Sequence, residues 1–468
     1  MPLTLDDFER DALSALTTYA TIECLSPAFD SLWSENGHID RAVDLLADWA
    51  KQRHFASFEV EVVRLPGRTP VLLVSVDATN DDEATIVLYG HLDKQPPLGD
   101  WSEGLAPYTP VRRGDQLFAR GVADDGYSTF SALLALEWLE AQGVAHSRSV
   151  VLIEASEESG SPDLDAYLDH LKDHLGRVEL MICLDSGALT YDRLWVTTSL
   201  RGLVNVEVTV EVLTRGQHSG TASGVVPSSF RVLRQLLDRL EDATTGMILL
   251  DELHGDIPVD VRRAAIDVAK EFGDELTADL PVVEGLTLMA PDAAERILNQ
   301  TWRPTLSVVG MAGIPAPEIA GNVLRPFTTA TLSFRLPPHV DAQRALLAIE
   351  NVLTENVPCG AHVTVTGQSS ADGWFSPRIS PWLERALDTA SQQAFGRPAS
   401  FSGEGGTIPF LASLARRYPG VQFLATGVLG PGSNAHGIDE MLDLPTTVAV
   451  TNVVSSVVAA FGHRKEEP

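Results

Sequence analysis

Cysteine and basic side chains are scarce in this 468-residue sequence, and each shortage excludes a class of protein. The three cysteines, Cys24, Cys183 and Cys359, are odd in number and far apart, which excludes a disulfide framework and a cysteine-rich zinc ribbon. Lysine and arginine total 34 against 64 aspartates and glutamates, so the formal net charge is −30. Nucleic acid and anionic membranes, being negatively charged themselves, are therefore not expected partners.

Long apolar runs are also missing. No run reaches the roughly 20 apolar residues that span a bilayer, and the N-terminal MPLTLDDFERDALSAL lacks the apolar core of a signal peptide. Together with reduced cysteines, these features predict a cytoplasmic location. What is present, 44% hydrophobic and 21% charged residues, is typical of a globular protein with a sizeable core. The length favours two or three domains.

Four apolar runs end abruptly near a His, Asp or Glu: TIVLYGHLD, VVLIEASEES, ELMICLDSGA and VQFLATGVLGPGSNAHG. Strands and helices alternate here at about the 30-residue spacing of βαβ units, which predicts a mainly parallel sheet. Such sheets bind ligands beyond the carboxyl ends of their strands. We therefore expect a metal site there. Its candidate ligands are His91, Asp124, Glu158, Asp185 and His436.

Each candidate alone has a simpler explanation, such as a helix cap, a core histidine or an exposed acidic pair. Their shared location carries the prediction. Imidazole and carboxylate ligands suit zinc, manganese or cobalt, and one zinc ion needs about three or four of them. Two histidines and three carboxylates suit two ions about 3.5–4 Å apart if one carboxylate bridges them. We predict two divalent ions per subunit, with zinc preferred over manganese or cobalt.

The patterning changes after Arg201-Gly202. LVNVEVTVEVL alternates with period two, which predicts a strand with one solvated face. The pattern of two helices and four strands that follows predicts a small inserted domain. We expect a catalytic domain over 1–200 and 380–468 and an inserted domain over 201–379, in which 243–300 carry no recognisable motif. Helices are predicted over 5–21, 41–53, 127–143, 380–396 and 445–461.

Five motifs in this order, GHLDKQP, ARGVADDG, EASEESGS, LDSG and SNAHG, resemble a known family. It is the co-catalytic dimetal peptidase and amidohydrolase family of carnosinase, bacterial dipeptidases, carboxypeptidase G, aminoacylase and succinyl-diaminopimelate desuccinylase. RGQHSG, GNVLRP, LSFRLPP and GEGGTIP look most like the dipeptidase and carnosinase branch. The resemblance spans nearly the whole chain. It implies a phosphorylase/hydrolase-like α/β catalytic domain, an inserted ferredoxin-like α+β lid and dimerisation domain, and a homodimer.

The resemblance also implies a role for each metal ligand. His91 and Asp185 would bind one ion, Glu158 and His436 the other, and Asp124 would bridge the two.

Two further acids receive roles in the same way. Asp93 would orient the His91 imidazole, although a turn cap would also explain it. Glu157 would be the general base, taking a proton from a water between the metals and returning it to the leaving amine.

Substrate groups come from the inserted domain by the same resemblance. His218 would reach the neighbouring subunit's site and polarise the scissile carbonyl, and Asn322 would assist at the same oxygen. Arg335, with Gly406 and Thr407, would hold the substrate's carboxylate, which suits the planar fork of arginine. Without the family, a surface-loop histidine and a strand-edge charge would explain His218 and Arg335.

The sequence departs from the family pattern at one place, just after the proposed bridging aspartate. The family usually places Lys-Gly where Gly126-Tyr127 follow Asp125 here, so the motifs leave the subgroup and its substrate open. The function predicted is a metallopeptidase that hydrolyses dipeptides or short peptides. A deacylase or desuccinylase of N-acyl amino acids would use the same metals. A non-catalytic binding protein on this scaffold would be expected to lack a ligand or the base.

Overall fold

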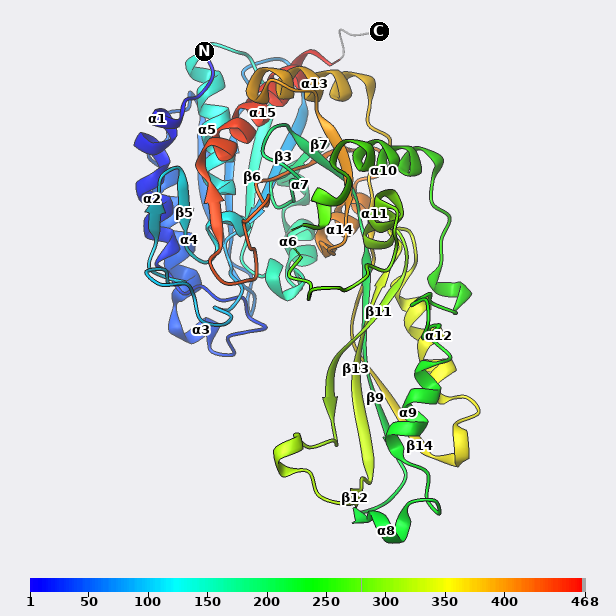
Figure 1. Cartoon of the computed structure of the whole chain (residues 1–468). Coiled ribbons are helices and arrows are strands. Elements are labelled where there is room, and N and C mark those ends of the chain that lie inside the picture. Colours follow the sequence, from blue (N-terminus) through cyan, green and yellow to red (C-terminus); the bar gives the residue numbers. More distant parts are fainter. Residues whose placement is uncertain (279, 465–468) are drawn as a thin grey trace. The chain divides into compact units, whose positions relative to one another are not determined.

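The computed structural model describes residues 1–278 and 280–464 and divides into two compact units (Figure 1). Unit 1 comprises Met1–Thr198, Ser376–Ser402 and Ser413–Pro468, and unit 2 comprises Ser199–Phe375 and Gly403–Ala412. Each unit has its own buried apolar cluster.

Unit 1 is built on a mixed sheet with the strand order β1-β2-β6-β3-β7-β17-β8. The central strands β6, β3, β7 and β17 are parallel, whereas β1, β2 and β8 join antiparallel. The predicted mainly parallel sheet is therefore correct only for the centre, and the sheet as a whole is mixed. The strands are β1 (Phe58–Val63), β2 (Val71–Val76), β3 (Ala84–His91), β6 (Arg148–Glu154), β7 (Arg177–Cys183), β8 (Trp195–Leu200) and β17 (Gln422–Ala425).

Helices cover this sheet, and every residue of β2 and β3 is buried. Strands that are apolar on both faces need cover on both faces. The helices of unit 1 are α1 (Leu5–Phe8), α2 (Ser14–Ala20), α3 (Trp33–Asn36), α4 (His38–Ala50), α5 (Ser128–Ala141), α6 (Leu164–His170), α7 (Lys172–Leu175), α13 (Pro381–Phe395) and α15 (Leu444–His463). A small sheet of β4 (Val111–Arg113), β5 (Gln116–Phe118) and β18 (Met441–Asp443) completes it, and α14 (Pro409–Arg417) and β16 (Ser400–Glu404) cross the unit boundary.

One helix among the described residues, α15, is long and apolar enough to cross a membrane. The expectation that no stretch reaches this length and apolarity was therefore wrong. In the structure 67% of its most apolar window is buried, and it packs against α5 and α13. Burial in the core accounts for its composition.

Glu154, the last residue of β6, is a carboxyl group buried inside unit 1. It accepts hydrogen bonds from the hydroxyls of Tyr89, Ser161 (2.8 Å) and Ser156 (3.2 Å). Burial raises the pKa of Glu154 from 4.5 to about 7, in spite of the bond from Tyr89.

This raised pKa makes the stability depend on pH. The folded state holds a proton that the unfolded chain releases, so a contribution of about 3 kcal/mol is fully present below pH 4.5 and is lost as the pH rises through about 7. Glu154→Gln is neutral at every pH and should lack this loss. We expect its free energy of unfolding in urea to match the parent near about pH 5 and to exceed it near about pH 8. Parallel pH dependences of the two proteins would contradict this assignment.

Unit 2 is an antiparallel sheet with the order β11-β13-β9-β14, covered on one face by α9 and α12. Val204, Val206, Val208 and Val210 are buried, and the residues between them are partly exposed. This is the period-two pattern that the sequence predicted. The main strands are β9 (Gly202–Glu211), β11 (Thr305–Ala312), β13 (Phe327–Leu336) and β14 (His362–Ala371).

The segment 243–300, which carries no motif, contains α10, α11 and two short 3-10 helices among its described residues. The helices of unit 2 are α8 (Ser219–Ala222), α9 (Ser229–Leu237), α10 (Val259–Phe272), α11 (Ala293–Thr301) and α12 (Ala342–Thr354), and its short strands are β10 (Gln217–His218), β12 (Val323–Leu324) and β15 (Trp374–Phe375).

Candidate active site

The predicted metal ligands of unit 1 lie together beyond the carboxyl ends of the central strands. His91 is the last residue of β3, and Asp185 follows β7 by two residues. Glu158 lies in the short turn Glu157–Ser159 after β6. Asp124 precedes α5, and His436 lies in the loop between β17 and β18. The strands β6, β3 and β7 are neighbours in the sheet (Figure 1). Adjacent parallel strands end at the same edge, so the residues at and just after their ends lie there.

Asp124 faces a histidine with each of its two oxygens. Oδ1 lies 3.1 Å from His91 Nε2, and Oδ2 lies 2.9 Å from His436 Nε2. Asp185 Oδ2 lies 3.7 Å from His91 Nε2, and Glu158 Oε2 lies 3.2 Å from His436 Nε2. The cluster thus has two halves that share one carboxylate, which is the arrangement that a pair of bridged metal ions requires.

The charges of the cluster favour the binding of a cation. Burial raises the pKa of Asp185 to about 8, because a carboxylate there has little water and acidic neighbours. Burial opposes protonation of His436, but the hydrogen bonds to Asp124 and Glu158 outweigh it and raise the pKa of His436 to about 11. Likewise Asp124 raises the pKa of His91 in spite of burial. Protons on the two imidazoles therefore balance the carboxylates, and divalent ions would supply that charge with neutral imidazoles as ligands.

The donor atoms also fit the spacing of a metal site. One nitrogen or oxygen from each of His91, Asp124 and Glu158 lies within 4.8 Å of the others, and the same holds for His91, Glu157 and Asp185. All are nitrogen and oxygen donors that zinc and manganese accept.

Asp93 connects the two strand ends at the site. His91 Nδ1 lies 3.1 Å from the Asp93 carbonyl oxygen and 3.5 Å from its carboxylate. The Asp93 carboxylate accepts the backbone N–H groups of Glu157 and Glu158, each at 3.1 Å. Asp93 therefore contacts the His91 ring and holds the turn that carries both glutamates, and its role in orienting the imidazole stays a prediction.

Glu157 and Glu158 differ in their surroundings although they are adjacent. Glu158 accepts a hydrogen bond from Gln95 at 2.7 Å and faces His436. The Glu157 carboxylate is buried, lies 4.0 Å from His91 Nε2 and accepts no hydrogen bond from the described residues. Burial raises the pKa of Glu157 well above its ordinary value. Such a carboxylate is able to take up a proton.

Glu440 is a residue of the site that the motifs did not reveal. It is fully buried, and its carboxylate accepts the backbone N–H groups of Gly121 (2.8 Å), Ala123 (3.0 Å) and Asp124 (3.2 Å). Arg120 bonds the same carboxylate at 2.7 Å. The only available signal in the sequence was an acid four residues after His436. The pairing of β18 with β5 places this acid at the site.

We expect Glu440→Gln to weaken metal binding without removing a ligand. The amide has one acceptor oxygen for four donors, and it leaves the buried Arg120 without its counter-charge. Loss of such an outer partner lowers metal affinity by about 10- to 100-fold. Competition with a chelator measures the affinity. Asp115→Asn, which also removes one negative charge but at an exposed position, is the control. Equal metal affinities in the two variants would contradict the supporting role of Glu440.

Lys94 lies inside the motif GHLDKQP, which assigned it no role. Its ammonium is fully buried and donates to the carbonyls of Tyr19 (3.2 Å), Ala20 (3.2 Å) and Ile22 (2.9 Å). These carbonyls lie at and just beyond the carboxyl end of α2, where a cation is favoured. Lys94 therefore ties the N-terminal segment to the loop that follows His91.

The predicted substrate residues all belong to unit 2, where they form two groups. Arg335 donates to the Thr407 hydroxyl at 2.8 Å, and Gly406 accepts the N–H of Arg201 at 3.0 Å. His218 is exposed at the end of β10, and Ser219 N–H, which follows it, bonds the Asn322 carbonyl at 2.9 Å. The roles of both groups in binding the substrate stay predictions.

Comparison with known proteins places these features in a family. A mixed α/β domain with histidines and carboxylates gathered beyond its strand ends is compatible with a metal-dependent hydrolase. The model of peptidase family M20/M25/M40 matches residues 87–460. The chain belongs to this family and is a peptidase, which confirms the resemblance seen in the motifs.

Relatives and solved structures agree. The cysteinylglycine-S-conjugate dipeptidase of Corynebacterium striatum is 26% identical over 384 residues, or 80% of each chain. The Cys-Gly metallodipeptidase DUG1 of Saccharomyces cerevisiae is 25% identical over 415 residues, covering 85% of this chain and 83% of the relative. The solved structure of Dug1p has a TM-score of 0.79 at 21% identity, covering 99% and 98% of the two chains. Human carnosine dipeptidase 1 has a TM-score of 0.76 at 19% identity, covering 98% and 97%. At these identities the structures show the fold.

Proposed function

We propose that this peptidase hydrolyses the peptide bond of dipeptides or short peptides with two divalent metal ions, zinc being preferred. Asp124, with one oxygen toward each histidine, is the observation that carries the proposal. Dipeptidases among the relatives support the substrate class. The three free cysteines, two of them buried, support action in the cytoplasm.

His91 and Asp185 would hold one ion, Glu158 and His436 the other, and Asp124 both. Bound there, the ions would supply Lewis acidity and make water a better nucleophile near neutral pH. Glu157 takes the proton of the attacking water at its carboxylate and gives it to the nitrogen of the leaving amine.

Arg335 supports recognition of the substrate's carboxylate. It is partly buried and forms no ion pair with the described residues, while Thr407 adds a hydroxyl beside it. A guanidinium without a carboxylate partner suits a carboxylate ligand. Gly406 leaves the backbone at this point open to close approach.

The two substrate groups lie at opposite ends of β13, which supports a homodimer. His218 pairs with Val323 just before that strand, whereas Arg335 is its ninth residue. Eight residues of strand span roughly 26 Å, far beyond the length of a dipeptide. His218 and Arg335 of one subunit therefore cannot contact the same small substrate. We propose that unit 2 is a lid and dimerisation domain, and that His218 and Asn322 act at the partner's site on the scissile carbonyl.

Mixing two inactive variants tests this sharing. His218→Ala removes the group donated to the partner, and Glu157→Gln removes the base of its own site. In a mixed dimer one site keeps both groups, so subunit exchange should restore up to about a quarter of the parent activity. Each variant mixed with itself is the control. No recovery in proven mixed dimers would contradict action between subunits.

A substrate panel tests the activity itself. Dipeptides, N-acetyl amino acids and N-succinyl amino acids are compared with zinc, manganese and cobalt. We expect the dipeptides to give the highest kcat/KM. Preference for the N-acyl substrates would instead identify a deacylase or desuccinylase. Activity that survives chelation in a protein without metal would contradict the metal mechanism.

A further inference from the structure

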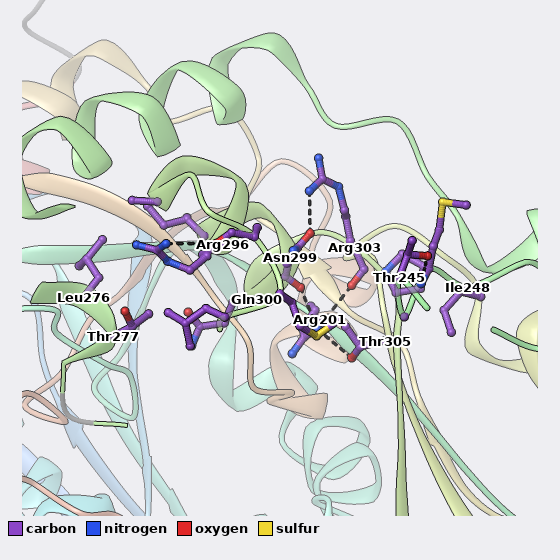
Figure 2. A pocket seen from close by; sticks show the side chains of 18 of the residues that line it. Arg201, Thr245, Ile248, Leu276, Thr277, Arg296, Asn299, Gln300, Arg303 and Thr305 are labelled. Atoms are coloured by element: carbon purple, nitrogen blue, oxygen red, sulfur yellow. Dashed lines mark hydrogen bonds between the residues drawn. The ribbon is translucent and has the colours of Figure 1, made fainter. Parts of the chain in front are cut away.

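A pocket of about 550 Å³ is lined by residues of unit 2, none of which was assigned to a metal ion or to the substrate, although the Arg201 N–H bonds the Gly406 carbonyl. It is formed by the turn around Thr245–Ile248, the segment that follows α10, and α11 (Figure 2). Its volume is in the range of pockets that enclose small organic ligands. This assigns a candidate role to the segment 243–300, which carries no motif.

The charge of the pocket is opposite to that of the protein. Its described lining residues include three arginines and no aspartate or glutamate, although the chain has 64 acids and a net charge of −30. Arg296 forms an ion pair with Asp274, and Arg303 forms one with Glu295. Arg201 forms no ion pair with the described residues. One uncompensated cation therefore remains, and it selects an anion.

Arg201 is only 8% exposed and is held rigidly. Its Nη1 donates to the carbonyl oxygens of Asn299 (3.3 Å) and Arg303 (3.4 Å) and to the Thr305 hydroxyl (3.3 Å), as Figure 2 shows, and its Nε donates to the Gly405 carbonyl at 3.2 Å. Its Nη2 donates no hydrogen bond to the described residues. Burial, together with Arg335, lowers the pKa of Arg201 to about 10. A buried cation without a counter-charge is costly, and an anionic ligand relieves that cost.

The walls of the pocket are apolar. Met247, Leu280 and Met289 line it and are 57%, 54% and 76% exposed. Ile248 and Ile297 add further apolar surface. Large apolar side chains that remain open to water around one cavity indicate a surface that a ligand covers.

We propose that this pocket binds a small organic carboxylate with an apolar body. The carboxylate bonds Arg201, and the apolar body lies against Met247, Leu280 and Met289. The inference goes beyond the peptidase activity, because all of the lining residues lie outside the metal cluster.

Calorimetric titration of the metal-loaded, full-length enzyme tests the chemistry of the ligand. The probes are octanoate, butyrate and octylammonium. Octanoate should bind at least tenfold more tightly than butyrate, because the longer chain buries more apolar surface. Octylammonium, with the opposite charge, should not bind measurably. Equal binding of octanoate and octylammonium would overturn the role of Arg201.

Three variants locate the binding. Arg201→Met should weaken octanoate binding at least tenfold. Arg303→Met, which removes a guanidinium already paired with Glu295, should change it less than threefold. Ala293→Trp places a large side chain in the pocket and leaves residue 201 as arginine. It should abolish octanoate binding, while the peptidase activity and the thermal stability persist. Unchanged octanoate binding in folded, active Ala293→Trp enzyme would place the ligand elsewhere, for example on the metals, and would overturn the proposal.

Discussion

Glu157→Gln should retain both metal ions and lose about 10²- to 10⁴-fold in kcat, which is the usual contribution of a general base. The carboxylate is buried, lies 4.0 Å from His91 Nε2 and accepts no hydrogen bond from the described residues. The amide keeps its shape but cannot take a proton from water. The measurements are kcat for the best dipeptide and metal content after dialysis.

Glu158→Gln is the matched control for this variant. It makes the same carboxylate-to-amide change at the adjacent residue. Glu158, however, faces His436 and accepts a hydrogen bond from Gln95. We expect this control to lose metal as well as activity. Because Glu157 also lies within ligand distance of His91 and Asp185, loss of metal from Glu157→Gln would identify it as a ligand. Near-normal turnover would contradict its role as the base.

Asp124→Asn should have the second large effect, on both halves of the cluster at once. Each oxygen of Asp124 faces a different histidine, at 3.1 Å and 2.9 Å. An amide offers one acceptor oxygen and no charge, so neither the charge nor the bridge survives. We expect metal content to fall below one ion per subunit and activity to fall at least about 10³-fold.

The metal content of single-ligand variants provides the comparison for Asp124→Asn. Glu158→Gln touches only the half of the cluster that contains His436, and Asp185→Asn only the half that contains His91. Each should leave one ion bound more tightly than Asp124→Asn does. If Asp124→Asn still held two ions with parent affinity, Asp124 would not be the bridge.

The sequence predicted the long helices and the gathered cluster because local signals carry them. The helix predicted over 127–143 is α5 (Ser128–Ala141), and the helix predicted over 380–396 is α13 (Pro381–Phe395). His91 ends an apolar strand, and Glu158 and Asp185 follow two others. Strand ends meet whenever the strands are parallel neighbours. Strand direction was harder to predict. β2 is buried on both faces like its parallel neighbours, so its composition does not reveal that it pairs antiparallel with β6.

The residues that hold the site in place could not be found in this way. Glu440 and Lys94 bond backbone groups that lie 316 to 319 and 72 to 75 residues away. Any residue type supplies a backbone N–H or carbonyl, so such bonds leave no pattern in the sequence. Arg201 is another example, because its guanidinium partners are two carbonyls of the segment before β11, a hydroxyl and the Gly405 carbonyl.

The three carbonyls around Lys94 change how the amino-terminal segment should be regarded. Tyr19, Ala20 and Ile22 look like ordinary backbone at the end of α2, yet their carbonyls accept the hydrogen bonds of an ammonium buried inside the protein. If that segment were trimmed away, Lys94 would lose these three acceptors, and the loop that follows His91 would lose its tie to the amino-terminal segment. Removing a segment that supplies no candidate ligand would thus loosen the loop beside His91 and Asp93, and the end of α2 acts as a support of that loop.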